Sequence, residues 1–187
     1  MSENKKVAVL LAEGFEEIES LTIVDVLRRA QITCDIVSIK DEYVKGAHNI
    51  LVKADKIIDD TIKNYDLIAL PGGLPGSTNL RDSKEVIELV QFFNDNNKFI
   101  AAICAAPIVL ARAGVISGKN VTSYPGYEKE LSEGNYIETE NVVADGNVIT
   151  SRGPATTLAF SYKIAETLGV NVDELKKGMM YNFFLEN

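Results

Sequence analysis

The chain has 187 residues, of which 46% are hydrophobic and 25% charged, with a formal net charge of −8 and a pI near 4.8. This length suits one domain, residues 1–187, with a core of its own, and the composition is ordinary for a globular protein. An acidic surface repels phosphate backbones, so we expect no nucleic-acid partner. No apolar run is long enough to cross a bilayer, so we expect no membrane partner.

Cysteine and histidine usage bears on the compartment and on metals. The chain has two cysteines and one histidine, too few for a disulfide framework or a structural zinc site. The first residues lack a signal-peptide pattern, so we predict a cytoplasmic protein with free thiols. We assign it no metal and no cofactor. Cys34 lies in an apolar run and is expected to be a small buried hydrophobic residue.

Apolar runs and helical periodicity alternate along the chain. This alternation predicts an α/β fold, in which a mostly parallel sheet has helices on both faces. The expected strands are residues 7–11, 32–39, 66–70, 99–103 and 120–122, with hairpins around residues 50–54 and 142–150, and the expected helices are residues 16–30, 83–96 and 155–168, with a last helix from residue 171. Residues 124–136 are expected to be a loop with one helical turn.

Three segments whose residues are suited to binding or catalysis follow predicted parallel strands. They are residues 13–19, residues 71–73 and Cys104. Ligands of such sheets bind outside the carboxyl ends of the strands, so we expect these segments to converge there.

Cys104 has the sequence surroundings of a reactive cysteine. It follows the apolar strand directly, and a helix is expected to begin at once and to stop at Gly114. Small residues at 102, 105 and 106 fit the tight turn of a nucleophile elbow. Partial positive charge at the helix start is expected to favour the thiolate. The alternative is a buried structural cysteine.

Gly72 and Gly73 end a predicted strand. They could serve the turn alone, or they could let a substrate carbonyl approach closely. In the second case the N–H groups of Gly73 and Ala105 would form an oxyanion hole. No Gly-Lys-Ser/Thr sequence follows, so a phosphate-binding loop is not indicated.

Acidic residues lie at the start of the first predicted helix. Glu16 and Glu17 suit the helix dipole and need no other function. Glu19 can reach Cys104 if it points toward the edge of the sheet. Beside a thiolate in a dry pocket it should carry a proton and act as a hydrogen-bond donor or as general acid and base. The single histidine, His48, is expected to lie at the surface or in an interface.

Together these segments resemble the ThiJ/PfpI superfamily, within the class I glutamine amidotransferase-like fold, and in it the branch of the parkinsonism-associated protein deglycase DJ-one. The motifs that carry the resemblance keep the family's order and spacing over nearly the whole chain. They are residues 12–19, 24–30, 70–73, 101–107 and 150–156.

The resemblance implies a flavodoxin-like three-layer sandwich, usually a homodimer. It implies that Cys104 is the nucleophilic or oxidisable cysteine and that Glu19 is its protonated partner, and it places Gly72, Gly73 and Ala105 around an anion site. Other residues that it points to are Arg152 and Pro154, at the pocket or the dimer edge, and His48 and Arg28, as interface candidates.

The sequence departs from the family at one position. Many members have a histidine where this chain has Tyr124, so we expect no cysteine–histidine peptidase, and Tyr124 is expected to line the pocket. With an unperturbed pKa of about 10, a tyrosine is a poor base at neutral pH. Proton transfer would therefore depend mainly on Glu19.

Two functions follow from the resemblance. The first is a cofactor-free glyoxalase or deglycase linked to the stress response, whose cysteine attacks a reactive aldehyde such as methylglyoxal. The alternative is a redox-sensing protein whose Cys104 is oxidised to a sulfinate. The expected partner is therefore a small carbonyl substrate or an oxidant, with an inert member of the family as a third possibility.

Overall fold

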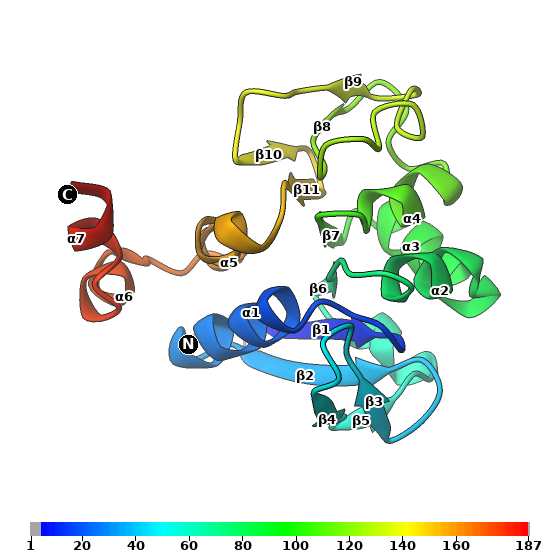
Figure 1. Cartoon of the computed structure of the whole chain (residues 1–187), viewed down its shortest axis with the longest axis horizontal. Coiled ribbons are helices and arrows are strands. Elements are labelled where there is room, and N and C mark those ends of the chain that lie inside the picture. The colour runs from blue at the N-terminus through cyan, green and yellow to red at the C-terminus, as the bar shows by residue number, and fades with distance from the viewer. Residues whose placement is uncertain (1–4, 187) are drawn as a thin grey trace.

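A seven-stranded sheet forms the centre of the molecule, which we describe from a computed structural model over residues 5–186 (Figure 1). The strand order is β10-β11-β7-β6-β1-β2-β5, and only β10 runs antiparallel to its neighbour. The strands of this sheet are β1 (Lys6–Leu11), β2 (Thr33–Ser38), β5 (Lys56–Ile57), β6 (Leu67–Leu70), β7 (Phe99–Ile103), β10 (Val142–Asp145) and β11 (Val148–Ser151).

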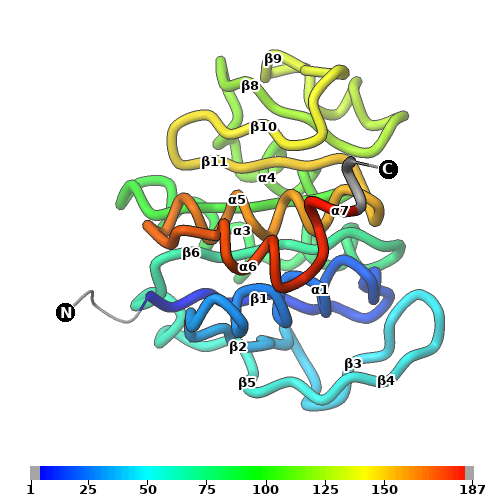
Figure 2. The backbone as a smooth tube through the Cα atoms, turned by 90° about the vertical axis from the view of Figure 1, so that its left-hand side faces the viewer, coloured from blue at the N-terminus to red at the C-terminus, as the bar shows by residue number. Residues whose placement is uncertain are grey.

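Two short two-stranded sheets lie at opposite ends of the central sheet. One pairs β3 (Tyr43–Lys45) with β4 (Leu51–Lys53), and the other pairs β8 (Asn120–Val121) with β9 (Asn135–Tyr136). Both views place the first pair beyond β2 and the second beyond β11 (Figures 1 and 2).

Helices cover both faces of the central sheet. The α-helices are α1 (Glu17–Arg29), α2 (Gly76–Asp82), α3 (Lys84–Asp95), α4 (Pro107–Arg112), α5 (Thr157–Thr167), α6 (Asp173–Gly178) and α7 (Tyr181–Glu186), and 3-10 turns span Asp60–Asn64 and Pro154–Thr156. None of the helices in the described part of the chain is both long and apolar enough to span a bilayer.

Successive side chains of β1 point to opposite faces of the sheet and belong to two different hydrophobic cores. Ala8 and Leu10 pack in the core that holds α2, α3 and α4, whereas Val7 and Val9 pack in the core that holds α1 and α5. A strand covered on both faces is apolar at every position, which is why β1 and β6 show no polar alternation. The predicted three-layer α/β sandwich with a mostly parallel sheet is confirmed.

Several predicted boundaries need correction. Helix α2 was not predicted, because Pro71, Pro75 and the glycines around them obscure the periodicity of its seven residues. Residues 124–136 form the predicted loop with turns, but its last two residues are strand β9. The last helix is two, α6 and α7, and both contain residues that are exposed to solvent.

The five parallel strands β2-β1-β6-β7-β11 have the order of flavodoxin-like folds. In this order, the connections after β1 and β6 leave on opposite faces of the sheet, which opens a crevice between the carboxyl ends of these strands. The segments after β1, β6 and β7 therefore meet at one edge, as the sequence predicts.

Candidate active site

Cys104 lies immediately after β7 with a backbone φ of +63°. Few residues other than glycine adopt this conformation, and such strain is concentrated at functional sites. Two backbone hydrogen bonds hold the turn: the Cys104 N–H donates to the Ser151 carbonyl at 3.0 Å, and the Tyr124 N–H donates to the Cys104 carbonyl at 2.9 Å. The neighbouring strand β11 and the segment after β8 thus fix the orientation of the thiol.

The expected tight turn between strand and helix is present and carries Cys104. A turn over residues 104–106 separates β7 from α4, which begins at Pro107 and ends at Arg112. A helix of six residues has a small macrodipole, and Cys104 lies outside its first turn. The electrostatic surroundings of the thiol therefore depend on other groups.

Glu19 is the nearest of these groups. It lies in the first turn of α1, is 0% exposed, and accepts a hydrogen bond from the Gly72 N–H at 2.7 Å through Oε2. Its carboxyl group is in hydrogen-bonding contact with the Cys104 thiol. Its other oxygen, Oε1, has no hydrogen-bond partner within the described residues. A buried carboxyl with a free oxygen is poorly stabilised as an anion.

Burial therefore raises the pKa of Glu19 to about 7, and the negative charge of Glu16 acts in the same direction. Burial also raises the pKa of Cys104 to about 12, with a further contribution from the Glu19 charge. Burial and the Glu19 charge thus oppose the expected shift toward thiolate, whereas the N–H groups of Gly73 and Ala105 favour it. Near pH 7 the pair is therefore about half ionised, and the negative charge is mainly on the carboxylate.

Gly72, Gly73 and Ala105 surround the sulfur. The N–H groups of Gly73 and Ala105 are in hydrogen-bonding contact with Cys104, and both lower its pKa. A Cβ atom at Gly72 would lie 2.6 Å from Glu19 Oε2 and 3.1 Å from Cys104 Sγ. Only glycine leaves room for the thiol and the carboxyl group at this point. The structure therefore brings these three residues together with Cys104 and Glu19.

The other predicted pocket residues are more peripheral. Tyr124 is half exposed, and its ring lies against Gly153, where a Cβ would approach it to 3.2 Å. The guanidinium of Arg152 donates to the Glu138 carbonyl at 2.7 Å and to Thr122 Oγ1 at 3.4 Å. Pro154 begins a 3-10 turn. These contacts link the segments after β8 and β11, next to the turn that carries Cys104.

The interface candidates lie near α1. Arg28 donates to the Cys34 carbonyl at 2.9 Å and to Asp55 at 2.7 Å, which joins α1 to β2 and to the segment before β5. His48 lies in the β3–β4 turn with an exposed side chain. Cys34 is buried as expected, and burial raises its pKa to about 12.

One further residue interacts with the site electrostatically and was not predicted. Burial raises the pKa of Tyr127, and negative charge on Cys104 raises it further, which places this phenol in the electrostatic range of the sulfur. It lies in the loop after β8, where the sequence carries no periodic signal. Only the folded structure brings it near β7.

The fold and the site define an α/β protein with a cysteine on a nucleophile elbow, a buried glutamate beside the sulfur and N–H donors around it. The chain belongs to the DJ-1/PfpI family, whose pattern matches residues 5–167. The resemblance found in the sequence is thereby confirmed.

Similar proteins lie in the DJ-1 branch of this family. Protein dj-1beta of Drosophila melanogaster is 41% identical over 182 residues, which are 95% of this chain and 97% of that protein. Its crystal structure matches with a TM-score of 0.90 at 40% identity, covering 95% of this chain and 98% of the other. The glutathione-independent glyoxalase DJ-1 of Schizosaccharomyces pombe is 33% identical over 172 residues, covering 86% of this chain and 90% of that protein.

Proposed function

We propose that the protein is a cofactor-free glyoxalase that converts a 2-oxoaldehyde such as methylglyoxal into the corresponding 2-hydroxy acid. The observation that carries the proposal is the pair formed by Cys104 and the buried Glu19. The similarity to the glyoxalase of S. pombe supports the reaction class. Because Cys34 and Cys104 are free thiols, a reducing compartment suits the protein, and we place its activity in the cytoplasm.

The first step is addition of sulfur to the aldehyde. The Glu19 carboxylate takes the thiol proton as the Cys104 sulfur forms a bond to the aldehyde carbon. The carbonyl oxygen becomes an oxyanion, which the N–H groups of Gly73 and Ala105 would stabilise. Glu19 then returns the proton to this oxygen, giving a hemithioacetal.

The second step moves hydrogen within the substrate. The Glu19 carboxylate removes the proton from the former aldehyde carbon and leaves an enediolate, in which the hydroxyl proton passes from the first oxygen to the second. Glu19 returns that proton to the neighbouring carbon, so that one carbon is oxidised and the other reduced, and a thioester remains on Cys104. Water then cleaves the carbon–sulfur bond and releases the hydroxy acid and the thiol. No external oxidant or reductant is needed.

Lactate production from methylglyoxal tests this proposal. We expect the purified protein to form lactate, Cys104→Ser to form none, and Glu19→Gln to lose at least tenfold in kcat. Cys34→Ser is the matched control, because Cys34 lies in β2 away from the site, and it should keep full activity. Turnover by Cys104→Ser at the wild-type rate would disprove the mechanism.

A second candidate function is redox sensing through Cys104. The same N–H donors could bind an oxygen of a cysteine sulfinate, and a protonated Glu19 could donate a short hydrogen bond to it. A structural relative, Toxoplasma gondii DJ-1, has been described in an oxidised form, with a TM-score of 0.84 and 33% identity over 96% of this chain. Mass spectrometry after mild peroxide treatment should show two added oxygens on Cys104 before Cys34 reacts. Oxidation of Cys34 first would contradict this role.

We further propose that the protein forms a homodimer through the outer face of α1 and the β3–β4 hairpin. Apolar side chains on these elements are exposed, namely Ile18, Leu21, Ile50 and Leu51. We expect twice the chain mass of 20.5 kDa in analytical ultracentrifugation. Ile18→Asp should yield monomer, whereas Ile57→Asp, on edge strand β5, should leave the mass unchanged. A monomeric wild type would contradict the proposal.

A further inference from the structure

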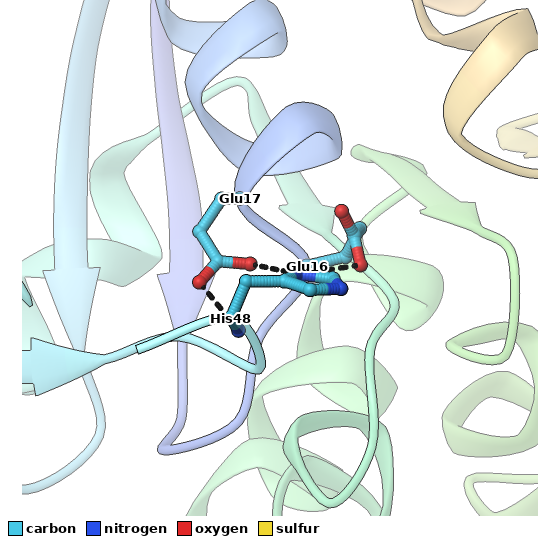
Figure 3. Close-up of side chains that lie close together, drawn as sticks. All are labelled: Glu16, Glu17 and His48. Atoms are coloured by element: carbon cyan, nitrogen blue, oxygen red, sulfur yellow. Dashed lines mark hydrogen bonds and ion pairs between the residues drawn. The ribbon is translucent and has the colours of Figure 1, made fainter. Parts of the chain in front are cut away.

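Glu16, Glu17 and His48 form a cluster outside the Cys104 site (Figure 3). Glu16 and Glu17 lie at the start of α1, and His48 lies in the β3–β4 turn. The imidazole lies between the two carboxylates, as Figure 3 shows. Each residue offers one potential metal-ligand atom, and these three atoms lie within 4.8 Å of one another.

The distances suit a metal ion. His48 Nδ1 lies 2.8 Å from Glu17 Oε2 and 3.6 Å from Glu16 Oε2. Metal–ligand bonds to imidazole and carboxylate are about 2.0–2.2 Å long, so two ligands on one ion lie roughly 3–3.5 Å apart. Two of the separations therefore lie close to those of coordinated ligands before any ion is present.

Glu17 is already oriented for such a role. Its Oε1 atom accepts the N–H of His48 at 2.7 Å and, at 3.4 Å, that of Ile50. A Cβ at Gly46 would lie 2.3 Å from this oxygen, so the glycine makes room for the carboxylate. These backbone contacts leave Oε2 directed at His48, whose Nδ1 lies 2.8 Å away. Such outer contacts fix the orientation of metal ligands.

Glu16 provides an independent indication of a ligand. Only 9% of the residue is exposed, yet its carboxylate has no hydrogen bond within residues 5–186, and its one ion pair is the 3.6 Å contact with His48. A carboxylate that is little exposed and has no hydrogen-bond donor among the described residues can take a bound cation as its partner. It is also free to rotate and to shorten its distance to a bound ion.

We propose that Glu16, Glu17 and His48 bind one divalent transition-metal ion, with water completing its coordination. One imidazole nitrogen and two carboxylate oxygens suit Zn²⁺, Co²⁺ or Mn²⁺. The two carboxylates carry −2, which outweighs the roughly +0.5 charge at the N-terminus of α1. In a single chain the His48 side chain is 68% exposed, so the ion can enter from solvent there. This inference does not rest on the glyoxalase proposal.

Titration of the full-length protein with Co²⁺, followed by visible absorption, tests the site, with Zn²⁺ as the competing ion. We expect one Co²⁺ per chain, displaced by one Zn²⁺. Glu16→Gln, Glu17→Gln and His48→Gln should each weaken binding at least tenfold. Glu17→Gln keeps the oxygen that accepts the backbone N–H groups, and His48→Gln changes an exposed side chain, so both variants should fold, which circular dichroism verifies.

Two control variants make the result specific. Glu13→Gln removes an exposed carboxylate from the same loop and should leave Co²⁺ binding unchanged. Cys104→Ser should also leave it unchanged, because the thiol is not a ligand in this proposal. No Co²⁺ binding, binding that survives His48→Gln, or binding that is lost in Cys104→Ser would each overturn the site.

Discussion

Cys104 and Glu19 titrate as a pair. Below pH 7 both groups carry protons, and above it the pair holds one negative charge that the carboxylate and the sulfur share. The fraction of reactive thiolate should therefore follow the ionisation of the pair. This makes Glu19 a base as well as the hydrogen-bond donor that the sequence predicts.

Alkylation of Cys104 should consequently depend on pH through Glu19. We expect the rate with iodoacetamide to rise about tenfold per pH unit below pH 7 and to level off above it, because the ionised fraction does so. In Glu19→Gln this limb should be absent, and the rate should follow the pKa of the thiol alone. The measurement is a rate profile from pH 5 to 9, with adduct position read by mass spectrometry. If the alkylation rate of Glu19→Gln still rises toward pH 7 and then levels off, a group other than Glu19 controls the reactivity of the thiol.

Gly72 should tolerate no side chain. Gly72→Ala places a methyl group 2.6 Å from both Cys104 Cβ and Glu19 Oε2, so the pair must separate. We expect at least a tenfold loss of activity and about 1–3 kcal/mol of stability. Gly178→Ala is the matched control, because a Cβ there meets nothing within 4 Å. Enzyme assays and urea unfolding of both variants test this. Full activity of Gly72→Ala would contradict the packing described here.

At the scale of elements, helices attach to the sheet through fully buried side chains. Phe93 of α3 is 0% exposed and belongs to the core on the α2–α4 face. Phe92, its neighbour in the same helix, is only partly buried, and the Lys63 ammonium lies 5.6 Å from its ring centre. The two positions have the same residue type and differ in the face of the helix that they occupy.

Phe93→Ala should therefore cost about 3–5 kcal/mol in the free energy of unfolding, because it leaves a cavity between α3 and the sheet. Phe92→Ala should cost less than half as much. Urea unfolding followed by circular dichroism measures both. Equal losses would mean that α3 does not pack as described.

At the scale of the whole molecule, the buried Glu19 makes folding pH-dependent. Its pKa is about 7 in the folded protein and near 4.5 when exposed, so the folded state binds more protons between these values. The contribution of Glu19 to the free energy of unfolding should be highest below about pH 4.5 and should fall as the pH rises to about 7. Above pH 7 it should stay level.

The difference in unfolding free energy between wild type and Glu19→Gln isolates this effect. Relative to Glu19→Gln, the wild type should lose roughly 3 kcal/mol of unfolding free energy between pH 4.5 and 8. Glu13→Gln, at an exposed position, should show no such trend. Urea unfolding at several pH values provides the measurement. A difference that does not change with pH would mean that Glu19 is ionised in the folded protein over this whole pH range.

The sequence by itself determined the sheet and the position of the nucleophile. Apolar runs such as residues 7–11 and 99–103 show where buried strands lie, and the small residues around Cys104 indicate a tight turn; both signals are local. Helix α2 escaped prediction because prolines and glycines interrupt its short pattern. The absence of a lowered thiol pKa could not be predicted, because it depends on burial and on the charge of Glu19.

Only the tertiary structure decided which groups meet. Glu19 and Gly72 are 53 positions apart, and His48 lies 31 positions from Glu17, yet each pair forms a hydrogen bond. Tyr127 comes near Cys104 for the same reason. Contacts of this kind depend on strand order and on which face each helix covers. Electrostatic effects act through space, so the chemistry of the cysteine follows from neighbours that sequence spacing does not reveal.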